Sequence, residues 1–159
     1  MKAHEGMRAG LAGGTAVWLW LLVSDTLARV PLKTPAMLGH GLLTIGAPNV
    51  HIPTWESVLA FTVAHFAAWI GLGGLMAIAV RAAARTASVL LFALLLTVLV
   101  QFLIVGITAI MAKGPLGGMA WRDVLIGNFI GWGTASWYLI RRHKELRAEL
   151  GSANQADDA

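Results

Sequence analysis

The chain has 159 residues, of which 57% are hydrophobic and only 13% are charged. This number of polar side chains is too small to cover the surface of a soluble globular protein. The composition therefore excludes a soluble globular protein and indicates a polytopic membrane protein. The chain has no cysteine, which excludes thiol chemistry. Its net charge is +4, and the basic residues flank apolar runs, so we expect the lipid bilayer, and no nucleic acid, as the partner.

The first apolar run predicts a membrane span over about residues 8–29. A basic start before an apolar core is also typical of a cleaved signal peptide. However, the acidic Asp25 lies just before the one plausible cleavage site, at the small residues near Ala28. We therefore expect the segment to be retained as a helix. Gly10 and Gly14 are four residues apart within this run, a spacing that permits another helix to approach closely.

A connection from Arg29 to Glu56 follows the first span. Thr34 and Pro35 are typical of a helix start, with a hydroxyl cap followed by a preset φ. The helical pattern continues only to about Ile45, which is too short to cross a membrane. The sequence therefore predicts a short helix that lies at the interface or is partly re-entrant.

The second span is predicted over residues 55–80, and His65 is its only ionisable group within the hydrocarbon. Helical spacing gives this span two different faces, both suited to contact with another helix. The first face contains Phe61, Thr62, His65, Trp69 and Leu72, and the second is a small-residue stripe of Ala60, Ala64, Ala67, Gly71 and Gly74.

Two further spans complete the predicted bundle. The third covers about residues 86–112 and has Gln101 as its one strongly polar side chain. The fourth covers about residues 120–141 and contains Asn128. We therefore expect an all-α fold with one four-helix transmembrane domain over residues 1–151.

The distribution of basic residues predicts the orientation of these spans. Eight Lys and Arg residues flank the spans on one side and four flank them on the other, which places both termini in the cytoplasm. The small, acidic tail over residues 152–159 is expected to be disordered. The cytoplasmic set is Lys2, Arg8, Arg81, Arg85, Arg141, Arg142, Lys144 and Arg147, and the outer set is Arg29, Lys33, Lys113 and Arg122.

In this topology His65 and Gln101 lie at similar depth in the outer half of the bundle, with Asn128 closer to the outer surface. Polar groups in hydrocarbon are costly unless they face inward and pair, so these three side chains predict a shared polar layer. The simplest role of His65 is to fix helix register. The alternative is a haem ligand or a quinone hydrogen bond, with Phe61 and Trp69 flanking a flat ring.

The remaining charged groups suggest three weaker hypotheses. Asp25 and Arg29 have the spacing of an ion pair, and a proton path through Asp25, His65 and Gln101 would indicate a small transporter. A metal site is not expected, because the spacing of His40, His51, Glu56 and His65 matches no standard one. Lipid head groups or a docking partner are expected at Arg141, Arg142, Lys144 and Arg147.

Three short motifs resemble an uncharacterised family of small bacterial four-helix integral membrane proteins. They are Thr34-Pro35-Ala36-Met37-Leu38-Gly39, then Ala64-His65-Phe66 followed by Gly71, and Arg141-Arg142-His143 with Glu145-Leu146. The resemblance implies a protein of the bacterial cytoplasmic membrane and brings no activity with it.

The leading hypothesis is a non-catalytic accessory or assembly subunit of a larger membrane complex. It rests on the two contact faces around His65 and on the lack of a catalytic motif in the sequence. The alternatives are a haem- or quinone-binding redox protein that uses His65 and a small proton- or ion-coupled transporter.

Overall fold

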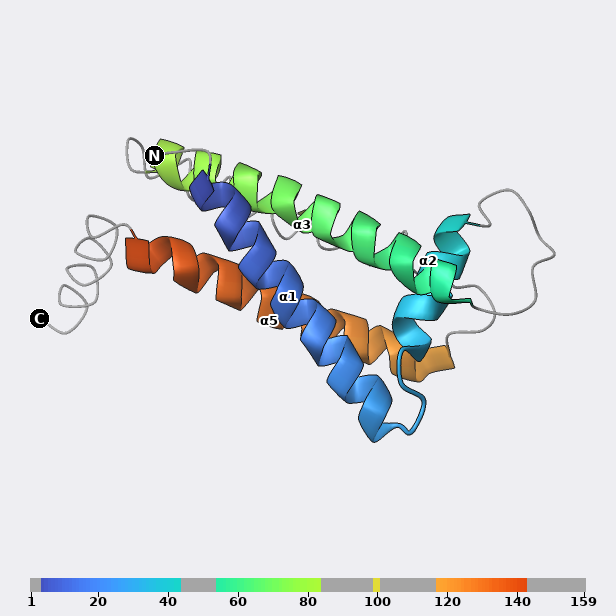
Figure 1. Ribbon diagram of the computed structural model, residues 1–159. Coiled ribbons are helices and arrows are strands. Elements are labelled where there is room, and N and C mark those ends of the chain that lie inside the picture. The colour runs from blue at the N-terminus through green and yellow to red at the C-terminus, as the bar shows by residue number, and fades with distance from the viewer. Residues whose placement is uncertain (1–3, 44–53, 84–98, 101–116, 143–159) are drawn as a thin grey trace, which may run out of the picture.

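The computed structural model describes residues 4–43, 54–83, 99–100 and 117–142. This part of the chain is helical and contains no strand, which confirms the all-α class for it (Figure 1). Most of the predicted third span, including Gln101, lies outside the described residues. The helices are α1 (His4–Leu27), α2 (Lys33–Leu43), α3 (Trp55–Ala83) and α5 (Gly117–Arg142).

Two of the described helices, α1 and α3, are long and apolar enough to cross a membrane. In α1 the segment His4–Leu27 has 24 residues, and in α3 the segment Trp55–Val80 has 26. Both coincide with predicted spans, although α1 begins before residue 8 and ends before residue 29. At about 1.5 Å per residue, each exceeds the roughly 30 Å thickness of a hydrocarbon core.

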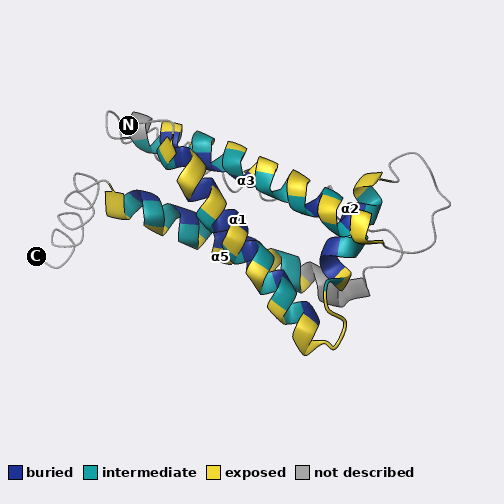
Figure 2. Cartoon of the chain, in the orientation of Figure 1, coloured by how far each residue is buried: buried dark blue, intermediate teal, exposed yellow. Residues whose placement is uncertain are grey.

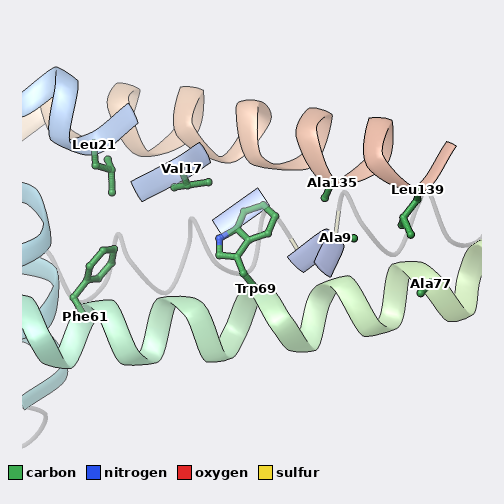
Figure 3. Close-up of a cluster of buried hydrophobic side chains, with 8 residues drawn as sticks. All are labelled: Ala9, Val17, Leu21, Phe61, Trp69, Ala77, Ala135 and Leu139. Atoms are coloured by element: carbon green, nitrogen blue, oxygen red, sulfur yellow. The ribbon is translucent and has the colours of Figure 1, made fainter. Parts of the chain in front are cut away.

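Helix α1 packs against both α3 and α5, whereas α3 and α5 contact each other little. The short helix α2 packs mainly against α3. Figure 1 shows that the start of α1 and the ends of α3 and α5 lie at the same end of the molecule. The buried residues form stripes along the facing sides of these helices, and the exposed residues lie on the outer sides (Figure 2). The core consists of Ala9, Val17, Leu21, Phe61, Trp69, Ala77, Ala135 and Leu139 (Figure 3).

Glycine residues bring the main chains of α1 and α3 together. A Cβ atom on Gly73 would overlap main-chain atoms of Gly6 and Gly10, and one on Gly10 would lie 2.8 Å from the Cα of Ile70. The predicted role of Gly10 is therefore confirmed. The contact on α3 uses Gly73, while a Cβ on Gly71 of the predicted small-residue stripe would meet nothing within 4 Å.

The short helix between the first two spans is also present, but its start differs from the prediction. It begins at Lys33, so Thr34 lies inside its first turn and is not the cap. It is described as far as Leu43, and the predicted end near Ile45 lies outside the described residues. The main-chain N–H of Thr34 is bound by a side chain from α1, as described below, and that side chain replaces the expected hydroxyl cap.

Substituting Gly73 with alanine should destabilise the fold, because the added methyl group would push the backbones of α1 and α3 apart. Overpacking of this kind costs about 1–3 kcal/mol. Thermal unfolding in mild detergent, followed by circular dichroism, should show a lower Tm for Gly73→Ala and no loss for the control Gly71→Ala. Equal Tm values for the two variants would contradict this packing.

Candidate functional site

Asp25 is a buried carboxylate, 6% exposed, that links the end of α1 to the start of α2. Its Oδ2 atom accepts a hydrogen bond from the main-chain N–H of Thr34 at 2.7 Å. Its Oδ1 atom accepts one from the Thr34 hydroxyl, also at 2.7 Å. The negative charge thus lies at the N-terminus of α2, where free N–H groups and the helix dipole stabilise an anion.

The chain reaches this geometry through two residues in the left-handed conformation. Arg29, with φ of 60°, follows the end of α1, and its N–H donates to the Thr26 carbonyl while that of Val30 donates to the Asp25 carbonyl. These two bonds make a Schellman motif. A second turn places Leu32, with φ of 63°, just before α2.

The predicted ion pair between Asp25 and Arg29 stays a prediction. Both carboxylate oxygens of Asp25 are bound by Thr34, while Arg29 is exposed in the turn. The sequence contains one signal for the observed contact: an acidic residue at the end of a helix, nine residues before the Thr-Pro start of the next. The pattern at Thr34 and Pro35 instead predicts that the Thr34 hydroxyl caps the helix.

Thr34→Val should destabilise the corner between α1 and α2, which is the turn closed by the contact of Asp25 with Thr34. The substitution removes the hydroxyl donor to Asp25 and keeps the side-chain shape. A hydrogen bond to a charged group contributes about 1.5–3 kcal/mol. The control is Thr26→Val, since the Thr26 hydroxyl bonds only locally, to the Leu22 carbonyl, on an exposed surface. Chemical unfolding should show a larger loss for Thr34→Val, and equal losses would show that the Asp25 contact adds nothing.

His65 projects from α3 onto the backbone of α1. Its Nε2 atom lies 2.9 Å from the carbonyl oxygen of Gly14. A carbonyl oxygen only accepts, so Nε2 carries a hydrogen and donates it. One turn away, the indole Nε1 of Trp18 donates to the Thr62 hydroxyl at 3.3 Å, which gives α1 and α3 a second polar contact.

Aromatic rings fill the surroundings of the imidazole. Phe61 stacks on His65 with ring centroids 5.2 Å apart, and Phe66 meets it edge-on at 5.5 Å. The Trp69 ring lies 6.3 Å from the ring of His65 and 6.0 Å from that of Trp132 on α5. It therefore connects the surroundings of His65 to α5. Figure 3 shows Trp69 reaching from α3 into the core. The sequence correctly grouped Phe61 and Trp69 with His65.

This arrangement does not fit a haem ligand at Nε2. Axial ligation requires a ring nitrogen with a free lone pair, and this nitrogen instead donates to Gly14. The flanking rings pack on the imidazole itself, as Phe61 and Phe66 show. Within the described residues, no group of three or more His, Cys, Asp or Glu side chains is placed to hold a metal ion.

The other members of the predicted polar layer are not joined to His65 by the described contacts. Asn128 on α5 is 8% exposed, and its Nδ2 atom has no hydrogen-bond partner among the described residues. Gln101 lies outside the described residues. The shared layer stays a prediction, and the observed partner of His65 is a main-chain carbonyl, which no side-chain pattern in the sequence reveals.

The basic cluster predicted at Arg141, Arg142, Lys144 and Arg147 is described at two of its four positions. The Arg141 guanidinium lies 3.9 Å from the ring centroid of Trp137, and that of Arg142 lies 5.7 Å from the ring of Tyr138. Each pair has the i, i+4 spacing that places side chains on the same helix face, so the sequence could have revealed both. Lys144 and Arg147 lie outside the described residues.

No known protein family, no curated protein and no solved structure matches this chain.

His65→Phe tests whether the imidazole is structural. The variant keeps a ring for Phe61 and Trp69 to pack on, but loses the hydrogen bond to Gly14, so we expect a loss of stability of about 1 kcal/mol. The purified wild type and variant should have the same visible absorption. A Soret band in the wild type that disappears in His65→Phe would contradict the structural role.

Proposed function

We propose that this chain is a four-span protein of the bacterial cytoplasmic membrane, with both termini in the cytoplasm. It serves as a non-catalytic accessory or assembly subunit of a larger membrane complex. In this proposal residues 86–112 form the third span, and α2 lies at the outer interface.

The observation that carries the proposal is the exposure of the most apolar described helix. The apolar stretch of α3 has a mean hydropathy of 1.9, yet only 17% of it is buried, against 39% for α1. Several of its large apolar side chains are exposed. They include Leu59, Val63, Leu75 and Ile78, whose exposed fractions are 52%, 63%, 57% and 56%. Such a face is stable against lipid or another apolar helix and unfavourable in water.

The two faces of α3 have different roles in this proposal. The face with His65 and Trp69 packs against α1. The small-residue stripe is left uncovered at Ala64, Ala67 and Gly71. A stripe of this kind permits close approach of a partner helix, so the proposed subunit contact lies on this side of α3.

The orientation is supported by the arrangement of the described helices. Arg8 in α1 and the Arg141–Arg142 pair in α5 lie toward the end of the molecule at which α1 starts and α3 and α5 finish. A cluster of basic residues at one end of the bundle is typical of the cytoplasmic side.

The redox and transport alternatives gain no support from the described contacts. His65 and Asp25 are the groups that those functions would use. Each instead holds two segments together through a hydrogen bond, His65 to Gly14 and Asp25 to Thr34. Both arrangements are typical of packing contacts between helices.

Site-specific photo-crosslinking in the native membrane tests the subunit role. A benzophenone amino acid at Val63, on the exposed face of α3, should yield one discrete adduct with a different protein. The control is the same substitution at Phe129 on α5, whose exposed fraction of 67% matches the 63% of Val63. No adduct at Val63, the same adducts at both positions, or an adduct of two copies of this chain would overturn the proposal.

A further inference from the structure

A groove of about 440 Å³ opens between the last two turns of α1 and the first turns of α5. Its walls are mostly apolar, with Val23 and Leu27 from α1 and Ile126 from α5. This volume lies within the roughly 300–1,000 Å³ range typical of small-molecule sites. In the proposed topology the groove lies at the outer end of the spans, where lipid head groups meet acyl chains.

The position of Trp20 in the groove is fixed. Its indole Nε1 donates to the main-chain carbonyl of Asp123 at 2.8 Å. Gly127 makes room for the ring, because a Cβ atom there would lie 2.9 Å from the Cδ1 of Trp20. These two contacts join α1 to α5 and hold one wall of the groove in place.

Two opposite charges also line the groove. Arg122 and Asp123 are adjacent in sequence, with side chains that are 69% and 18% exposed. The Nε atom of Arg122 lies 3.8 Å from the Oδ1 atom of Asp123. This exceeds the roughly 2.7–2.9 Å of a charge-assisted hydrogen bond. Neighbouring residues on a helix do not face each other, so this pair leaves both groups able to bind other charges.

We propose that this groove binds one phospholipid with a phosphoethanolamine head group. The guanidinium of Arg122 binds the phosphate, the carboxylate of Asp123 binds the ammonium, and an acyl chain lies along Val23, Leu27 and Ile126. A purely anionic head group would satisfy Arg122 and be repelled by Asp123. The inference rests on the proposed membrane location.

Native mass spectrometry of the purified protein tests this site, with phosphatidylethanolamine and phosphatidylglycerol of identical acyl chains as probes. The wild type should bind phosphatidylethanolamine more tightly. Arg122→Gln should weaken the binding of both lipids about tenfold, because it removes the charge-assisted hydrogen bond from the guanidinium to the phosphate. Asp123→Asn should weaken only phosphatidylethanolamine and reverse the preference.

Two further variants separate this groove from general lipid contact. Ala28→Trp should fill the groove and abolish the preference while both charges remain. Arg8→Gln, at the other end of α1, should leave it unchanged. An unchanged lipid preference in Asp123→Asn, or an equal loss in Arg8→Gln, would overturn the site, provided that the variants unfold at the wild-type temperature. A protein that stays soluble without detergent and retains no lipid would instead overturn the membrane function itself.

Discussion

The close approach of α1 and α3 at Gly10 and Gly73 is the contact on which most of the described structure depends. Only when two helix backbones touch can a side chain from one reach the main chain of the other. The hydrogen bond from His65 to Gly14 requires this, because the carbonyl it binds already belongs to a helix. In hydrocarbon, where there is no hydrophobic drive between helices, such packing and hydrogen bonds supply the association energy.

The sequence predicted the helices well and their contacts less well. Unbroken apolar runs predict α1 and α3, because the length needed to cross a membrane is a property of the run itself. The choice of Gly73 over Gly71 as the contact residue could not be predicted. Both glycines lie in the same apolar run, and only the crossing position of α1 selects one of them.

At the candidate site, too, the sequence indicates which residues need a partner but not which partner they contact. The sequence identified Asp25 and His65 as groups that need partners, since burial of a polar group is costly. The partners that the structure shows, Thr34 and the Gly14 carbonyl, do not follow from the regular spacing of side chains along a helix. Asp25 reaches Thr34 only because Arg29 and Leu32 adopt positive φ, a conformation that the sequence does not predict for residues other than glycine or asparagine. His65 binds a main-chain carbonyl, and every residue has one.

The corner between α1 and α2 also bears on the order in which the chain assembles during synthesis. The contact between Asp25 and Thr34 closes a loop of only nine residues, whereas that between His65 and Gly14 joins groups 51 residues apart. Loop closure costs less entropy when the loop is short. We therefore expect the corner to form as soon as α2 has been synthesised, which fixes the C-terminal end of α1 before α3 packs against it.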